Sequence, residues 1–337
     1  MPELRRDPVV GSWVIVATDR ARRPSDYRIE HTAPIGGGVC PFCSGNEERT
    51  PREVHACRPH DGPAARSGAP GWKTRVFPNK FPALMVEGDL DRSGDGIYDR
   101  MNGIGAHEVI VETPDHGRQL HDLDEAELGL VIDAWRARVI DLRKDIRFRY
   151  VLVFKNHGAA AGVSIEHTHS QLIALPTVPK HVADELAGAK EHYARKERCV
   201  YCDIVRQELA ERSRVIHENQ DFVVLAPWAS RFPFETWILP RRHRSSFEET
   251  PAAELHQLAN ALRTALRKLQ RALDDPPYNF VVHTAPLRQG EMAHYHWHIE
   301  IVPTLTRPAG FEMGSGYYIN PTPPEEAARF LRELPAQ

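Results

Sequence analysis

The feature that constrains the fold most is an internal repeat, because a duplicated series of elements predicts two similar halves. Each half opens with a CxxC pair, continues with a strand ending in a histidine and a helix, and finishes with two strands that carry closely spaced histidines. The matching segments are CPFC and CVYC, HEVIVETPDH and FETWILPRRH, YVLVF and YNFVV, and HTHSQLIALP and HYHWHIEIVP. The repeat covers most of the 337 residues.

The helices of the two halves have similar amphipathic patterns. Asp122 is the expected N-cap of the first helix, with Glu125 placed for a capping box. Thr250 opens the second helix, and Pro276 stops it. Their apolar stripes are Leu128, Ile132, Trp135, Val139 and Leu142, and Leu255, Leu258, Leu262, Leu266, Leu269 and Leu273. We therefore predict an α+β fold with two repeats, each an antiparallel sheet with a packed helix, joined into one extended sheet.

A charged helical connector over residues 179–198 is expected to join the halves, which we assign to residues 1–185 and 186–337. The net charge of −3 and pI near 6.7 argue against a general nucleic-acid binder. No apolar run approaches the roughly 18 residues that span a bilayer, and no signal peptide is evident, so a soluble cytoplasmic protein is expected. Four of the five cysteines form CxxC pairs, which suits metal thiolates better than disulfides. Cys57 is expected to be free.

Residues 155–176, KNHGAAAGVSIEHTHSQLIALP, combine a glycine-bearing turn, two histidines and a glutamine. In a strand, His167, His169 and Gln171 share one face, whereas Thr168 and Ser170 point away. Two imidazoles and an amide on one face can divide the work of holding a metal and attacking phosphorus. The alternative is an ordinary strand face that carries polar residues.

The repeated cysteine and histidine positions predict two zinc sites, each with four protein ligands. The first set is Cys40, Cys43, His116 and His167, and the second is Cys199, Cys202, His243 and His294. A zinc ion with four protein ligands has no open position, so it stabilises structure and does not activate water. Iron is the alternative metal for the second site.

If His167 faces the metal, His169 is free to act as a nucleophile. Its imidazole can attack an α-phosphorus and form a reactive phosphoramidate. Gln171 can donate its amide N–H to a phosphoryl oxygen. The turn from Gly158 to Ser164, which includes Gly162, has small side chains, so backbone N–H groups and the Ser164 hydroxyl can approach the same oxygens.

At these residues the chain resembles galactose-1-phosphate uridylyltransferases, the transferase branch of the histidine-triad superfamily. The likeness runs from Asp7 to about Ala328. It rests on DRARRP, CPFC, VFPNKFPAL, the PDH that ends at His116, FKNHGAAAGVSIEHTHSQ, FPFETWILP, HWHIEIVP and GFEMGSG. The resemblance implies a histidine-triad-like fold, zinc, a nucleotide sugar and a hexose 1-phosphate as substrates, no nucleic-acid or membrane partner, and a homodimer.

The resemblance also implies residue roles. His169 takes up a nucleoside monophosphate, and Gln171 stabilises that intermediate. Glu312 and His298 lie where the family places hexose contacts and second-metal chemistry. Nucleotide- or phosphate-contacting positions match Arg20, Arg23, Asn79, Lys80, Phe81, Asn156 and Ser164. For the arginines near residue 20, the alternative is a solvated surface turn.

Several departures bear on the substrate. The usual His-Pro-His is His167-Thr168-His169 here, and a second CxxC replaces the glutamate-and-histidine metal site of the familiar bacterial enzymes. Glu300 stands where a histidine is usual, and Glu185 could match the metal glutamate. These features resemble relatives that act on ADP-glucose. The leading hypothesis is uridylyl transfer from UDP-glucose to galactose 1-phosphate through His169. The alternatives are ADP-glucose phosphorylase or adenylyltransferase chemistry and a zinc-organised nucleotide-binding protein without turnover.

Overall fold

The computed structural model describes residues 1–17, 24–27, 39–58 and 68–335. Its main feature is a ten-stranded sheet in which all neighbouring strands are antiparallel. Across the sheet the strands follow in the order β10 (Val215–Glu218), β11 (Phe222–Leu225), β12 (Thr236–Pro240), β14 (His298–Pro303), β13 (Tyr278–His283), β8 (Tyr150–His157), β9 (His169–Leu175), β7 (Ala106–Val111), β4 (Thr74–Pro78) and β3 (His55–Cys57).

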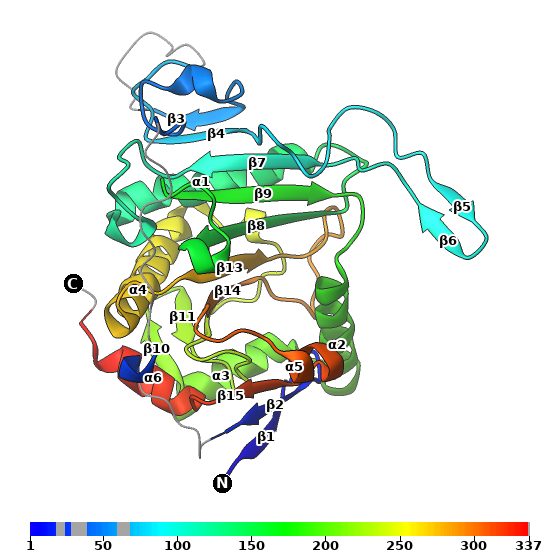
Figure 1. Ribbon diagram of the computed structural model, residues 1–337. Coiled ribbons are helices and arrows are strands. Elements are labelled where there is room, and N and C mark those ends of the chain that lie inside the picture. The colour runs from blue at the N-terminus through cyan, green and yellow to red at the C-terminus, as the bar shows by residue number, and fades with distance from the viewer. Residues whose placement is uncertain (18–23, 28–38, 59–67, 336–337) are drawn as a thin grey trace.

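This order is symmetric about the centre of the sheet. Each half contributes five strands, and the two halves meet where β8 pairs with β13, with Tyr278 opposite His157 and Val282 opposite Val153. Figure 1 shows the strands of the two halves next to one another in one continuous sheet. The predicted α+β fold with two repeats joined into one extended sheet is confirmed.

Two long helices, α1 (Glu125–Leu142) and α4 (Leu255–Leu273), cover one face of the sheet and pack against each other. The predicted apolar stripes are buried there, with only Leu142 partly exposed. The predicted cap of the first helix is wrong by two residues. Asp124 is the N-cap and forms the capping box with Glu127, whereas Asp122 belongs to a preceding 3₁₀ turn.

The opposite face of the sheet carries two smaller apolar clusters, one in each half. Strand alternation produces this division. Val76 and Leu172 point to the helix-covered face, whereas Phe77 and Val109 pack in the N-terminal cluster on the opposite face. The opposite face is covered only in part, since Phe154 of β8 and Ile173 of β9 stay half-buried there. The histidines of interest lie on this face, away from α1 and α4.

The connector between the halves is α2 (Lys180–Lys196), which runs across the predicted boundary at residue 185. The remaining helices are α3 (Val200–Glu211), α5 (Gly310–Ser315) and α6 (Pro324–Glu333). Strands β1 (Glu3–Arg6), β2 (Trp13–Val16) and β15 (Tyr318–Asn320) form a small sheet, and β5 (Ser93–Asp95) pairs with β6 (Tyr98–Arg100) in a projecting hairpin. Short 3₁₀ turns are η2 (Pro24–Asp26), η3 (Glu47–Arg49), η4 (Leu120–Asp122), η5 (Ala159–Ala161), η6 (Phe247–Glu249) and η7 (Ala252–Glu254). Among the described residues, none of the helices has the length and apolar character needed to cross a membrane.

Candidate active site and metal-binding groups

The first predicted ligand set comes together as one group, Cys40, Cys43, His116 and His167. Cys43 Sγ lies 3.5 Å from His116 Nδ1 and 3.6 Å from His167 Nδ1, and Cys40 Sγ lies 3.7 Å from His167 Nδ1. Zinc–ligand bonds in a tetrahedron place sulfur and nitrogen ligands about 3.5 Å apart. The group therefore has the donor types and the spacing that suit a zinc ion.

His167 is oriented for this role by its second ring nitrogen. Its Nε2–H donates to the Thr113 carbonyl oxygen at 2.7 Å, which leaves the Nδ1 lone pair directed at the cysteines. Phe42, which lies between the two cysteines in the chain, packs edge-on against His167 and His169 with ring centroids 6.3 and 5.3 Å away. The metal-binding group and the candidate nucleophile are thus one packed unit.

His169 opens β9 and is held in a defined tautomer. Its Nδ1 lies 2.9 Å from the His167 carbonyl oxygen, which can only accept a hydrogen bond, so Nδ1 carries the proton and Nε2 keeps its lone pair. Burial, reinforced by the positive charge of Lys155, lowers the pKa of His169 to about 4. The ring is therefore a neutral imidazole near pH 7, which is the form that can act as a nucleophile.

A buried ionic network, which the sequence did not indicate, contacts the same segment on the opposite side from the cavity. Lys155 is 1% exposed, and its Nζ donates to Glu112 Oε2 (2.7 Å), Thr168 Oγ1 (2.9 Å) and the His169 carbonyl oxygen (3.0 Å). Thr168 Oγ1 in turn donates to Glu112 Oε2 at 2.6 Å. Thr168, which separates the two histidines in the chain, is thus tied to a buried lysine and glutamate.

The predicted division of β9 into two faces is confirmed. Thr168 meets the Lys155 network, and Ser170 Oγ accepts a hydrogen bond from Trp135 of α1 at 2.8 Å. His169 and Gln171 instead line a cavity of about 310 Å³ on the other face. Other predicted residues that line this cavity are Asn79, Lys80, Phe81 and Ser164. Arg49 and Thr50, for which the sequence carried no signal, also line it.

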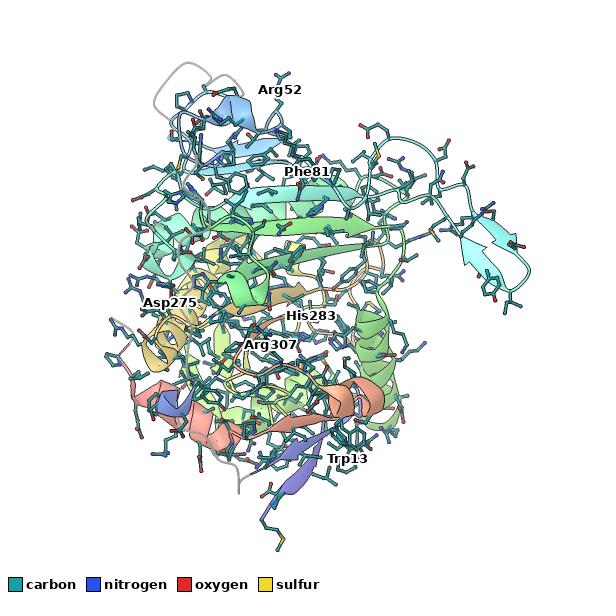
Figure 2. The ribbon with its side chains drawn as sticks, in the orientation of Figure 1. Trp13, Arg52, Phe81, Asp275, His283 and Arg307 are labelled. Atoms are coloured by element: carbon teal, nitrogen blue, oxygen red, sulfur yellow. The ribbon has the colours of Figure 1, made fainter. Side chains whose placement is uncertain are left out.

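Other predicted contact residues do not line this cavity. Asn156 accepts a hydrogen bond from Asn279 at 2.7 Å, near the left-handed Gly162 (φ +92°) of the turn. Glu312 is half-buried on α5, which belongs to the C-terminal half and lies beside β15 in Figure 1. His298 belongs to the C-terminal half as well. Figure 2 labels Phe81 above the N-terminal strands and His283, a neighbour of His298, near the middle of the sheet. Arg20 and Arg23 lie outside the described residues.

The second ligand set requires a correction, because the structure groups Cys199, Cys202 and His243 with His296 and not with His294. Cys202 Sγ lies 3.4 Å from His243 Nδ1 and 3.6 Å from His296 Nδ1. The His296 ring donates Nε2–H to the Pro240 carbonyl oxygen at 3.0 Å, as His167 does to Thr113. This group also suits zinc.

The error arose because HYHWH contains two overlapping HxH pairs. Strand β14 begins at His298 as β9 begins at His169, so His296 corresponds to His167 and His298 to His169. The His294 ring instead lies 6.4 Å from that of Tyr193 on α2. Glu300 consequently occupies the position equivalent to Gln171.

The two histidines make a direct test of this correction. We expect His296→Ala to lose the metal of the C-terminal group, because it removes one of four ligands. His294→Ala should keep it, because its ring lies outside the group. Metal content per chain by mass spectrometry measures both, and loss of metal in His294→Ala alone would restore the original assignment.

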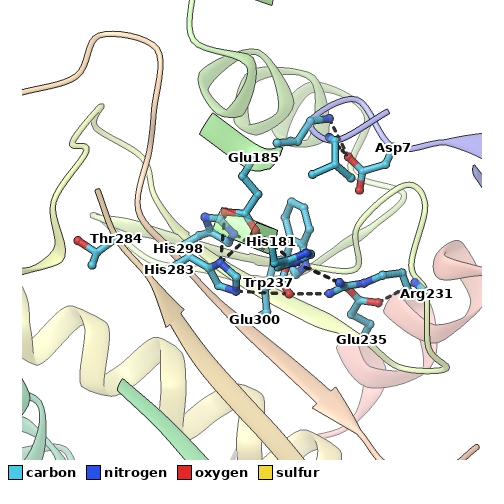
Figure 3. A network of polar contacts seen from close by, with 12 residues as sticks. Asp7, His181, Glu185, Arg231, Glu235, Trp237, His283, Thr284, His298 and Glu300 are labelled. Atoms are coloured by element: carbon cyan, nitrogen blue, oxygen red, sulfur yellow. Dashed lines mark hydrogen bonds and ion pairs between the residues drawn. The ribbon is translucent and has the colours of Figure 1, made fainter. Parts of the chain in front are cut away.

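A third group of possible ligands in the C-terminal half is Glu185, His283, His298 and Glu300, and all of these except His283 line another cavity. All four side chains are buried, and the rings of His283 and His298 stack 4.7 Å apart. Figure 3 shows this network, in which Arg231 donates to Glu300 Oε2 at 2.6 Å and His283 Nδ1 lies 3.0 Å from Glu185 Oε1. His298 Nε2 is buried without a hydrogen-bond partner among the described residues. Two carboxylates and two imidazoles could hold a divalent cation.

Comparisons with known proteins match the whole chain. The family models for galactose-1-phosphate uridyl transferase match residues 1–179 (N-terminal domain) and 185–336 (C-terminal domain). The chain is 37% identical to ADP-glucose phosphorylase from Arabidopsis thaliana over 99% of this chain and 93% of that protein. It is 29% identical to galactose-1-phosphate uridylyltransferase from Thermotoga maritima, over 99% of this chain and 98% of that one.

Solved structures agree with these matches. The crystal structure of an Arabidopsis thaliana ADP-glucose phosphorylase with bound ADP-glucose has a TM-score of 0.84 at 36% identity and covers 100% of both chains. A uridylyltransferase structure has a TM-score of 0.76 at 29% identity and covers 98% of this chain and 97% of that one.

Proposed function

Because this chain belongs to the galactose-1-phosphate uridylyltransferase family, we propose that it transfers a nucleotidyl group from a nucleotide sugar by way of His169. The observation that carries the proposal is the tautomer of His169. With Nδ1–H donated to the His167 carbonyl oxygen, Nε2 has a free lone pair in a ring that also lines a cavity.

In the first step, His169 Nε2 attacks the α-phosphorus of the nucleotide sugar. A P–N bond forms, the bond from that phosphorus to the bridging oxygen breaks, and hexose 1-phosphate leaves with the electron pair. In the second step, an oxygen of the acceptor phosphate attacks the same phosphorus, and the P–N bond returns its electrons to Nε2. Both leaving groups are weakly basic, so positioning and charge stabilisation supply most of the rate.

The residues around His169 have distinct roles in this proposal. Gln171 donates its amide N–H to a non-bridging phosphoryl oxygen, and the Ser164 hydroxyl approaches the same group from the turn. Lys80 and Arg49 supply positive charge at the cavity lined by His169. Asn79 and Phe81, at the same cavity, contact the nucleotide.

Zinc is the metal we assign to both Cys2His2 groups, where it supplies structural cross-links and leaves no position for substrate. The first group fixes His167, and His167 fixes the tautomer of His169 through its carbonyl oxygen. We also assign the protein to the cytoplasm and expect a homodimer.

Similarity to known proteins supports two candidates for the nucleotide sugar that donates the nucleotidyl group. The 37% identity to ADP-glucose phosphorylase, over nearly the full length of both chains, favours ADP-glucose as donor and inorganic phosphate as acceptor. The sequence hypothesis, UDP-glucose with galactose 1-phosphate, is the second candidate. It is supported by relatives at 27–29% identity that are galactose-1-phosphate uridylyltransferases.

Incubation with ADP-glucose or UDP-glucose, each labelled in the α-phosphorus, distinguishes the two donors. We expect ADP-glucose to label His169, with a stoichiometric burst of glucose 1-phosphate in the absence of acceptor. Peptide mapping of the acid-labile label identifies the residue. Labelling by UDP-glucose alone would select the second candidate. Tight binding of both sugars without a burst would instead support a nucleotide-binding protein without turnover.

A further inference from the structure

The amide of Gln171 has a fixed partner, His107 of β7. His107 Nε2 lies 2.8 Å from Gln171 Oε1. His107 is half-buried, and it pairs with Ile173 in the sheet, so it lies diagonally across from Gln171 on the neighbouring strand. Neither His107 nor this contact was singled out by the sequence.

The direction of this hydrogen bond follows from the other ring nitrogen. The backbone N–H of Ala83 donates to His107 Nδ1 at 3.2 Å, and an amide N–H cannot accept. Nδ1 is therefore unprotonated, and the single proton of the neutral ring is on Nε2. His107 is the donor, and Gln171 Oε1 is the acceptor.

Asn79 contacts the same ring nitrogen but does not support either donor assignment by itself. Its Oδ1 accepts from the Phe81 backbone N–H at 2.9 Å, so its Nδ2 group is what faces His107 Nε2, 3.2 Å away. That amide could donate to Nε2 only if the ring proton were on Nδ1, where the Ala83 N–H already points. The backbone N–H of Ala83 can only donate, so we assign the ring proton to Nε2. In that tautomer the Asn79 contact joins two donors and is not a hydrogen bond, whereas the shorter contact with Gln171 Oε1 is one.

We propose that His107 is a positioning residue that fixes the orientation of the Gln171 amide, so that its oxygen faces His107 and its N–H groups face the phosphoryl group on His169. An amide side chain can rotate by 180° and exchange its oxygen and nitrogen. Only one of those orientations donates to a phosphoryl oxygen, because the other places two negative oxygens together. This inference rests on the proposed function, which assigns the phosphoryl group to His169.

The tautomer can be measured without substrate. Long-range ¹H–¹⁵N NMR correlation of the resting protein should show His107 protonated on Nε2, with the signal assigned by its loss in His107→Gln. A ring protonated on Nδ1 would overturn the inference whatever the enzyme does, whereas failure of wild-type protein to release hexose 1-phosphate would count against the proposed function only.

A double-mutant cycle tests whether His107 acts through Gln171. Loss of an oriented donor typically slows turnover by about 10²–10³-fold. We expect His107→Phe to lower the single-turnover rate of hexose 1-phosphate release by about 10- to 100-fold, with little change in KM. In a Gln171→Ala background, the same replacement should have no further effect. His107→Gln, which can return an N–H to the Nε2 position, should recover part of the rate.

The opposite pattern would contradict the proposal. If His107→Phe slowed the reaction by the same factor with and without Gln171, His107 would act by another route. If it raised KM alone, His107 would contribute only to substrate binding. Thermal unfolding and metal content of each variant separate these outcomes from a general loss of structure.

Discussion

Replacing His169 by asparagine is expected to lower nucleotidyl transfer by at least about 10⁴-fold, because the variant lacks the nitrogen that bonds to phosphorus. Asparagine has an amide N–H near the position of Nδ1, so the contact with the His167 carbonyl oxygen can persist. The fold and both metals should therefore be retained. Rapid-quench measurement of hexose 1-phosphate release, together with the melting temperature and metal content, checks the three expectations.

His294→Asn is the matched control for this experiment. His294 lies on the C-terminal half, outside the groups that could hold a metal among the described residues. Its replacement should leave the burst and the labelling of the enzyme unchanged. Wild-type turnover in His169→Asn would exclude His169 as nucleophile, even if the variant bound the nucleotide sugar tightly.

The sequence predicts the fold well because the duplicated pattern specifies strand order and apolar stripes together. The spacing of apolar residues predicted the buried face of each helix correctly. All six stripe leucines of α4 and four of the five stripe residues of α1 are in the core. The boundary of α1 was wrong because Asp122 and Asp124 are both suitable caps. The two aspartates accept backbone N–H groups in consecutive capping boxes, and local pattern alone does not order them.

The sequence predicted site residues only where they lie close together in the chain or recur at matching positions in the two halves. His167, His169 and Gln171 share a strand face by simple alternation. The choice between His294 and His296 depended on sheet register, which HYHWH leaves ambiguous because its histidines repeat every two residues. The register of this segment follows from the start of β14 at His298, which the sequence does not mark.

The residues that the sequence missed act through contacts across the sheet. Lys155 and His107 lie in strands with an ordinary apolar pattern, and Glu112 directly follows β7. Only the pairing of β7 and β8 with β9 brings these residues to His169 and Gln171. A buried lysine in an apolar strand is the one signal that could have been used, since such a charge requires a partner.

Replacing Cys43 by serine is expected to remove the first metal and to lower the melting temperature by on the order of 10 °C, because structural zinc contributes several kcal/mol to folding. Cys43 contacts both His116 and His167, so its loss frees both imidazoles. With the His167 ring no longer held by a metal, its backbone carbonyl oxygen should hold the His169 ring less rigidly. Transfer should therefore fall even well below the melting temperature. Metal analysis, thermal unfolding and the burst assay measure these effects.

Two control variants separate the contribution of this metal to folding from its contribution to His169. Cys202→Ser should lose the other metal and destabilise the protein comparably, yet retain transfer within about tenfold, because distant sites act independently. Cys57→Ser should change neither metal content nor transfer, since Cys57 belongs to neither group. If Cys43→Ser and Cys202→Ser lowered transfer equally at a temperature where both are folded, the first metal would have no special link to His169. Equal loss would then be a consequence of reduced stability alone.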